Sequence, residues 1–170
     1  MSPSTAYVAL GGNLGDRLTT LRSAVTQLAA HPAIDVRRRS SVYETAPVGP
    51  SNEPFLNATL GVSTELDPLA LLEVLHDIER VHGRKRRVRW DARTLDLDLL
   101  LFFAPGQDTP LVSEDPRCRL PHPSMLQRDF VLTPLVDLAP ALILEGRTLT
   151  AHLSALPDPQ RTVLASVGAL

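Results

Sequence analysis

This chain of 170 residues contains few cysteine and aromatic residues, and its net charge is small. The single cysteine, Cys118, excludes an internal disulfide framework and a cysteine-rich zinc site. The formal net charge is only −2, which gives no support to a dedicated nucleic-acid binder. The N-terminus lacks a basic leader segment, and no apolar run approaches the roughly 18 residues of a membrane span. We therefore expect a soluble cytoplasmic protein without a membrane segment.

The length suits one domain with a sizeable core. No repeat or low-complexity linker divides the chain, so we expect a single domain over residues 1–170, with 1–5 and about 157–170 less well specified. Fifteen prolines indicate many fixed turns. With only four Phe, two Tyr and one Trp, any aromatic residue outside the core is a candidate for ligand binding.

Hydrophobic periodicity predicts six elements in the order βαββαβ: strands over 6–10, 34–43 and 55–64, helices over 16–30 and 67–82, and a strand beginning near Thr94. Weaker patterns predict a brief strand at 111–112, helical segments from Ser124 to Leu138, a late strand over 141–145 and a short helix over 149–156. This order indicates an α+β fold with a ferredoxin-like βαββαβ core.

Two carboxylates stand out in the stretch 94–101, TLDLDLLL. Because strand side chains alternate, Asp96 and Asp98 share one face of the predicted strand. At roughly 6–7 Å apart they repel each other by about 2–3 kcal/mol at an effective dielectric constant near 20. A protonated carboxyl, a neighbouring base or a cation must offset this repulsion, and Mg²⁺ prefers such oxygen ligands. Solvated strand edges carry similar pairs, but the apolar flanks here disfavour that interpretation.

A strongly basic segment precedes this strand, with Trp90 between the two. Five positive charges fall within six residues and a sixth follows: Arg84, Lys85, Arg86, Arg87, Arg89 and Arg93. Such a run alone is usually a solvated loop or a nucleic-acid patch. Beside an acidic strand it favours the binding of a metal-complexed polyphosphate. Because like charges repel, we expect the loop to be mobile until a polyanion orders it as a lid.

A flat polar ring is the second ligand we expect. Phe55 and Phe130 could sandwich it while Asn57 and backbone groups near Thr45 contact its edge, although core packing explains both aromatics equally well. His122, held between two prolines, is either a phosphate or nucleotide contact or a residue that fixes its loop. The glycine-rich turn over 11–17 is more simply a tight turn with a helix cap than a phosphate site. Walker, G-x-G-x-x-G, H-E-x-x-H and G-x-S-x-G motifs are absent.

Several motifs, in this order and spacing, resemble the 6-hydroxymethyl-7,8-dihydropterin pyrophosphokinase family of folate biosynthesis. The resemblance runs from Ala6 to about Pro140. The motifs are ALGGNLGD (9–16), SVYETAP (41–47), FLNA (55–58), RTLDLD (93–98), LPHP (120–123) and RDFVL (128–132) followed by Pro134 and Leu135. The family usually has Trp-Gly-Pro-Arg where this chain has Trp90-Asp91-Ala92-Arg93, and many members have Pro in place of Ala46.

The resemblance implies transfer of the β,γ-diphosphate of ATP to the pterin hydroxymethyl group, with release of AMP and with two Mg²⁺ ions as cofactors. It also implies a three-layer α/β/α sandwich with mobile loops, built on the ferredoxin-like core. By position, Asp96 and Asp98 bind the metals, and Arg84 and Arg93 are the catalytic cations. The implied pterin contacts are Thr45, Ala46, Val48, Phe55, Asn57, Trp90 and Phe130. The implied ATP contacts are Glu79, Arg86, Arg89, Leu99, Arg117, His122 and Arg128.

Two rival functions follow from the same sequence. A ferredoxin-like nucleic-acid-binding module could use the basic loop 84–93, but the aromatic RNA-binding motif of such domains is missing. A P-loop kinase that forms ADP is the second rival, but this chain lacks the Walker lysine that such a kinase needs. We expect no nucleic-acid or membrane partner and a monomer, and we leave open an association with neighbouring folate-pathway enzymes.

Overall fold

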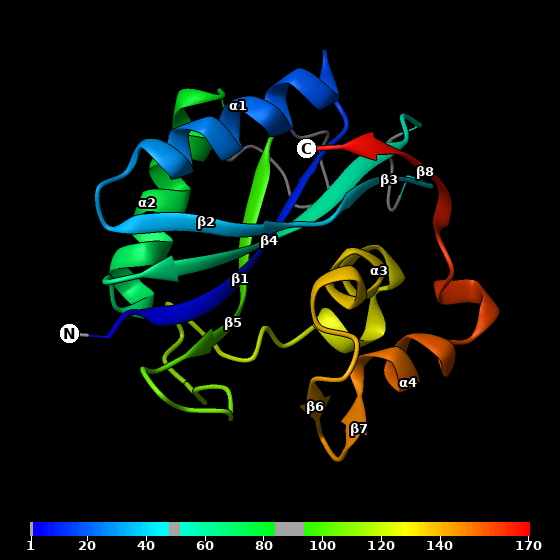
Figure 1. The fold of residues 1–170 in the computed structure, drawn as a ribbon. Coiled ribbons are helices and arrows are strands. Elements are labelled where there is room, and N and C mark those ends of the chain that lie inside the picture. The colour runs from blue at the N-terminus through cyan, green and yellow to red at the C-terminus, as the bar shows by residue number, and fades with distance from the viewer. Residues whose placement is uncertain (1, 48–51, 84–93) are drawn as a thin grey trace.

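The computed structural model describes residues 2–47, 52–83 and 94–170 (Figure 1). The basic loop that we expected to be mobile therefore lies outside the described residues. In chain order the strands and helices are β1 (Ser4–Gly12), α1 (Arg17–Ala30), β2 (Ile34–Arg39), β3 (Ser41–Thr45), β4 (Phe55–Thr64), α2 (Pro68–Val81), β5 (Asp96–Phe103), α3 (Asp129–Leu138), β6 (Ile143–Leu144), β7 (Arg147–Thr148), α4 (Leu149–Ser154) and β8 (Val163–Ala169). Short 3₁₀ helices cover Met125–Gln127 and Asp158–Gln160.

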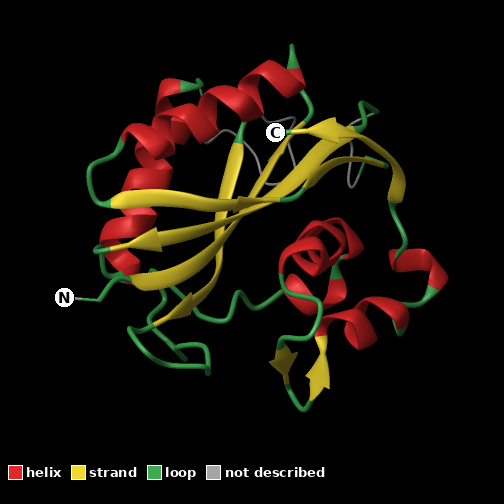
Figure 2. Ribbon diagram, in the orientation of Figure 1, coloured by secondary structure: helices red, strands yellow, loops and turns green. Residues whose placement is uncertain are grey.

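The main sheet has the strand order β5-β1-β4-β3-β8, and β2 pairs with the other end of β4. Helices α1 and α2 cover one face, whereas α3 and α4 lie on the other (Figures 1 and 2). The predicted α+β class, βαββαβ core and three-layer arrangement are confirmed. Within the described residues, none of the helices combines the length and apolar character needed to cross a membrane.

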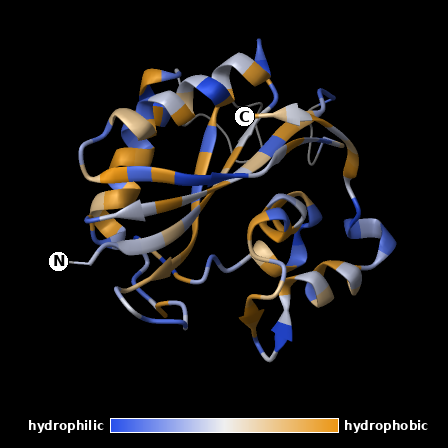
Figure 3. Cartoon of the chain, viewed as in Figure 1, coloured by the Kyte–Doolittle hydropathy of each residue, from blue (hydrophilic) through white to orange (hydrophobic). Residues whose placement is uncertain are grey.

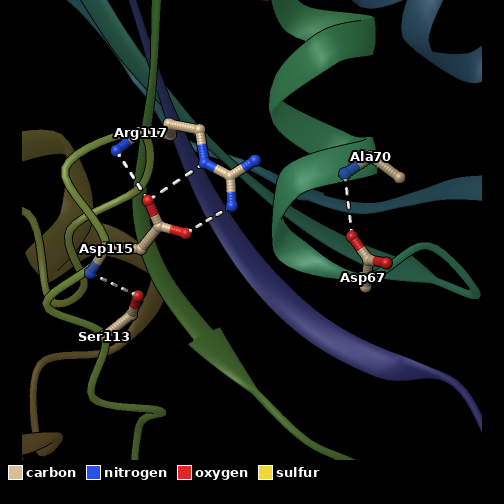
Figure 4. Close-up of polar contacts among 5 residues, drawn as sticks. All are labelled: Asp67, Ala70, Ser113, Asp115 and Arg117. Carbon is tan, nitrogen blue, oxygen red and sulfur yellow. Dashed lines mark hydrogen bonds and ion pairs between the residues drawn. The ribbon is translucent and has the colours of Figure 1, made fainter.

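Side-chain alternation divides the interior into two cores. Ala6, Val8 and Leu10 of β1 belong to the core beneath α1 and α2. Tyr7 and Ala9 of the same strand pack against the second core, which α3 and α4 cover. Both long helices begin as predicted: Asp16 accepts a hydrogen bond from the Thr19 N–H, and Asp67 accepts one from the Ala70 N–H (Figure 4).

The single strand predicted over 34–43 is wrong, because the chain forms two strands that separate at Ser40. The Ser40 N–H donates to the Thr59 carbonyl at 2.9 Å, and the Ser40 hydroxyl oxygen accepts from the Thr59 N–H at 2.8 Å. The Ser40 side chain thus accepts the hydrogen bond that a backbone carbonyl would accept in a regular strand pair. The three arginines that follow Val36 make the second half of β2 hydrophilic (Figure 3).

The C-terminal third differs most from the sequence prediction. Residues 111–112 form no strand, although the Leu111 N–H donates to the Phe102 carbonyl at the edge of β5. The late strand expected over 141–145 is only the two-residue β6, which turns into β7. The poorly specified tail contains β8, which pairs with β3 and extends the sheet. Its side chains are mostly exposed and show little apolar–polar alternation, so the sequence did not indicate it.

Helix α3 is fastened to β3 near its C-terminal end. Asp137 accepts hydrogen bonds from the Tyr43 hydroxyl at 2.8 and 2.9 Å and from the Ser41 N–H at 3.2 Å. Partial burial, together with this carboxylate, raises the pKa of Tyr43 to about 12. The neutral phenol is therefore the form that the fold stabilises.

We expect Tyr43 to ionise near pH 12, measured by phenolate absorbance, and Asp137→Asn to lower its pKa toward the ordinary value of 10. Since the folded pKa lies above the unfolded one, this contribution to stability is complete below pH 10 and is lost as the pH rises toward 12. The Tyr43→Phe variant lacks this phenol and so identifies which part of the absorbance change belongs to Tyr43. Identical titrations of the wild type and Asp137→Asn would contradict the assignment.

Candidate active site

The two carboxylates of β5 lie on the face of the sheet that α3 covers. Leu97 and Leu99 belong to the opposite core, so the predicted alternation is confirmed. Asp96 is the cross-strand partner of Gly11, and Asp98 is the partner of Ala9. Both aspartates are partly exposed, whereas every residue of β5 from Leu99 onward is buried. The carboxylates therefore sit at the more open end of a strand that is otherwise core.

The same row continues across the sheet to Asn57. Gly11 faces Asp96 on one side and Asn57 on the other, so the three residues share one face. The absence of a side chain at Gly11 leaves space between the carboxylate and the amide, because a Cβ there would lie 2.9 Å from Asn57 Oδ1. The row thus presents an acid and an amide toward a common space.

Asn57 is buried and is held by a neighbouring strand. Its Nδ2 donates to the Thr45 hydroxyl oxygen at 2.7 Å, and Thr45 is itself the cross-strand partner of Phe55. The structure therefore brings together Thr45, Phe55 and Asn57 from the list of expected pterin contacts, with Ala46 next in the chain. Phe55 is only partly buried.

Residues Asn13 and Arg17, to which we had assigned no role, bind the end of the loop that leads into β4. Arg17 donates to the Pro54 carbonyl at 2.8 Å and pairs with Glu44 at 3.2 Å, while Asn13 donates to the Glu53 carbonyl at 3.4 Å. Their only sequence signal was the glycine-rich turn itself. The interpretation of this turn as a helix cap is supported, and the turn has this second, positioning contact.

Glu79 approaches the carboxylate strand from helix α2. This side chain is buried, and its Oε1 accepts a hydrogen bond from the Leu97 N–H at 2.8 Å. Leu97 lies between the two aspartates, at the outer edge of β5. Glu79 therefore binds the backbone that carries both carboxylates, a contact that its helical position alone did not reveal. Leu99, an expected ATP contact two residues further on, is buried in the core beneath α1 and α2 and is 4% exposed.

His122 lies on the same side as the carboxylates. Its backbone N–H donates to the Leu100 carbonyl at 2.9 Å, and its ring Nδ1 accepts from the Ser124 backbone N–H at 3.3 Å. The neutral ring accordingly carries its proton on Nε2. Burial lowers the pKa of His122, the cation of Arg128 lowers it further, and the charge of Asp96 opposes them. These charges place His122, Arg128 and Asp96 in one electrostatic environment.

Arg128 and Phe130 come from the start of α3. The guanidinium carbon of Arg128 lies 5.7 Å from the centroid of the Phe130 ring, within cation–π range. Phe130 packs against the second core and, like Phe55, is only partly buried. Phe130 therefore comes from the helix that covers the carboxylate face, whereas Phe55 belongs to strand β4 of the sheet.

Arg117 has a close partner of its own (Figure 4). Its guanidinium group forms a two-point ion pair with Asp115, at 3.1 and 2.7 Å, and its backbone N–H donates to the same carboxylate. This arginine lowers the pKa of Asp115 to about 2. An ATP contact by Arg117 would have to compete with this pair. Six further expected site residues lie outside the described part of the chain: Val48, Arg84, Arg86, Arg89, Trp90 and Arg93.

The carboxylate pair fits Mg²⁺. Among the described residues, no group of three or more His, Cys, Asp or Glu side chains is arranged to hold a metal. Mg²⁺ is usually bound by one or two carboxylates, with water and substrate phosphates as the remaining ligands. Asp96 and Asp98 would supply the protein ligands of such a set, so the donor chemistry suits a metal that arrives with a polyphosphate.

Comparison with known proteins places the chain beside one group of relatives. Residues 7–140 match the family model described as 7,8-dihydro-6-hydroxymethylpterin-pyrophosphokinase (HPPK). A Bacillus subtilis protein named 2-amino-4-hydroxy-6-hydroxymethyldihydropteridine pyrophosphokinase is 46% identical over 134 residues, which are 78% of this chain and 77% of that protein. A Methylorubrum extorquens protein of the same name is 43% identical over 155 residues, covering 91% of this chain and 94% of its own length.

Solved structures share the fold. A Plasmodium falciparum HPPK-DHPS chain, solved with pterin and p-hydroxybenzoate, superimposes with a TM-score of 0.67 at 17% sequence identity. The match covers 89% of this chain and 43% of that chain. The chain therefore spans less than half the length of that HPPK-DHPS protein.

We expect the His122 ring to titrate below its ordinary pKa of 6.5 in the protein without ligands, measured by NMR. Arg128→Ala should raise this pKa, because a repelling cation is removed, whereas Asp96→Asn should lower it further. Since the folded pKa is depressed, the contribution of the neutral ring to stability is present above pH 6.5 and is lost as the pH falls through the folded pKa. A pKa that is unchanged in both variants would refute the proposed environment.

Proposed function

This chain belongs to the 7,8-dihydro-6-hydroxymethylpterin-pyrophosphokinase family, and from that premise we propose how its residues carry out the reaction. The enzyme transfers the β,γ-diphosphate of ATP to the hydroxymethyl group of 6-hydroxymethyl-7,8-dihydropterin, a step of folate biosynthesis. The products are the dihydropterin diphosphate and AMP. The cross-strand row of Asp96, Gly11 and Asn57 carries the proposal, since it sets an acid for a metal–phosphate complex beside an amide for the pterin.

In the transfer, the hydroxymethyl oxygen forms a bond to the β-phosphorus of ATP. The bond from that phosphorus to the oxygen bridging the α- and β-phosphates breaks, and AMP leaves with the electron pair. The hydroxyl proton is released. Such reactions ask little covalent chemistry of the protein, so positioning and charge neutralisation account for most of the catalysis.

Asp96 and Asp98 would hold two Mg²⁺ ions, which neutralise phosphate charge and orient the phosphate groups when bound. The Glu79 contact to the Leu97 N–H would keep the two carboxylates at a fixed position on β5. We assign Glu79 this role together with the nucleotide-side position expected for it. Binding the metals also removes the repulsion between the two carboxylates.

The pterin would lie between Phe55 and Phe130, over the space left by Gly11. Asn57 and the backbone near Thr45 and Ala46 would bind the polar edge of the ring, because amide and backbone groups can match its donors and acceptors. The Thr45 hydroxyl accepts one N–H of the Asn57 amide and so fixes its orientation, which leaves its carbonyl oxygen to accept from the ligand. Val48 and Trp90 are proposed to complete this site.

His122 would donate its Nε2–H to a phosphate oxygen as a neutral ring, and Arg128 would add a positive charge beside it. Arg84 and Arg93 are proposed as the catalytic cations, with Arg86, Arg89, Leu99 and Arg117 as further ATP contacts. The cytoplasmic location, the monomeric state and any association with neighbouring folate enzymes remain predictions. The alternative nucleic-acid-binding function is not favoured, because the family match covers most of the chain.

With ATP, Mg²⁺ and the dihydropterin, we expect AMP rather than ADP, resolved by chromatography. Asp96→Asn and Asp98→Asn, which keep the shape of each side chain but remove its charge, should each lower the rate about a hundredfold or more, because metal binding depends on both carboxylates. The matched control is Asp108→Asn on an exposed turn, which should retain the wild-type rate. ADP formation would refute the reaction, and wild-type rates in both strand variants would refute the metal assignment.

Gly11→Ala tests the space between the carboxylate and the amide. Its new Cβ would lie 2.9 Å from Asn57 Oδ1, so we expect the amide to be displaced and KM for the pterin to rise about tenfold. Gly61→Ala is the matched control, because this glycine of β4 lies on the same face of the sheet as Asn57, but its Cβ would meet the Arg38 side chain at 3.3 Å. A similar rise in pterin KM for both variants would show that strand distortion, rather than loss of the Asn57 contact, is responsible.

A further inference from the structure

We propose that Asp129 and Thr162 are positioning residues that hold the two pterin-binding walls, the end of β3 and the start of α3, at a fixed separation. The inference rests on the proposed function, because it takes Thr45, Ala46 and Phe130 as pterin contacts. We call the group formed by Asp129, Thr162 and Val163 the Asp129 clasp. Asp129 lies within residues 7–140, the part that matches the family model, whereas Thr162 and Val163 lie beyond it.

The clasp consists of three hydrogen bonds to one carboxylate. The Thr162 N–H and the Val163 N–H donate to Asp129 Oδ2 at 2.5 and 2.8 Å, and the Thr162 hydroxyl donates to Oδ1 at 2.5 Å. Asp129 is 3% exposed, so this carboxylate is withdrawn from water and depends on these donors. It is also the first residue of α3, where the helix N-terminus favours a negative charge.

The same two residues are fastened to the end of β3. The Thr162 carbonyl accepts from the Ala46 N–H at 2.7 Å, and Val163 is the cross-strand partner of Thr45. Thr45 in turn accepts from Asn57. An unbroken series of backbone and side-chain bonds therefore runs from Asn57 through Thr45 and Ala46 to the clasp.

On the other side, the clasp leads directly to the aromatic wall. Asp129 immediately precedes Phe130 and immediately follows Arg128, whose guanidinium group lies over the Phe130 ring. Fixing the carboxylate fixes the first turn of α3 and with it the direction of both side chains. Asp129 and Thr162 act on the ligand only through these neighbours, so they are positioning residues rather than catalytic ones.

Asp137 provides a matched control within the same helix. It also binds β3, through the Ser41 N–H and the Tyr43 hydroxyl, but from the other end of α3. Loss of either contact weakens the attachment of α3 to the sheet. Only loss of the clasp also frees the residues next to Ala46 and Phe130, so the two contacts should differ in their effect on the pterin.

The experiment measures KM for the pterin, KM for ATP, kcat and the melting temperature in four full-length variants. Thr162→Val removes only the hydroxyl donor and should raise the pterin KM about fivefold, while Asp129→Asn should raise it tenfold or more. The ATP KM should rise by a smaller factor in both, because Arg128 is the one proposed ATP contact that adjoins the clasp. Thr162→Ser keeps the donor and should match the wild type. Asp137→Asn should lower the melting temperature without changing the pterin KM.

Two results would overturn the proposal. One is an unchanged pterin KM in Thr162→Val and Asp129→Asn with only a lower melting temperature, as expected of a purely structural contact. The other is an equal rise of both KM values. If the wild-type protein formed no AMP, the proposed function would fail separately. The clasp would then be judged by equilibrium binding of the fluorescent pterin, which Thr162→Val must weaken.

Discussion

The antiparallel register of β5, β1 and β4 is the constraint on which the site depends. It places Asp96 opposite Gly11 and Gly11 opposite Asn57, so that three strands contribute to one row on one face. A shift of one residue in β5 would turn both carboxylates into the apolar core beneath α1 and α2 and would turn Leu97 toward the ligand. The buried leucines of β5 therefore fix the position of the chemistry as well as the stability of the strand.

One face of the sheet forms the larger apolar core, and the other carries the candidate site residues. The face beneath α1 and α2 is lined by apolar side chains, and the buried carboxylate of Glu79 binds the edge of β5 from this side. The face beneath α3 is apolar around Leu101 and Phe103 but becomes polar toward the start of β5. Hydrogen bonds between side chains make polar groups tolerable there, as the Asn57–Thr45 pair illustrates.

Helix α3 links the ligand side to the edge of the sheet. Asp137 binds β3 near one end of the helix, and Asp129 binds the segment leading into β8 at the other. Carboxylates that accept several hydrogen bonds restrict the relative motion of the elements they join. Asp137 is exposed, but Asp129 is buried, so breaking its contact would also leave a buried charge without its partners. The helix that carries Arg128 and Phe130 is thereby held at both ends.

Local patterns were sufficient for the order βαββαβ, the caps at Asp16 and Asp67 and the shared face of Asp96 and Asp98, because each follows from residues close together in the chain. Motif spacing likewise identified the family and the expected ligand residues. Tertiary structure alone decided the break at Ser40, the pairing of β8, the Glu79 contact to Leu97 and the Asp129 clasp. These features depend on register and on contacts between distant segments, which no local periodicity encodes, and Asp129 and Thr162 are 33 residues apart.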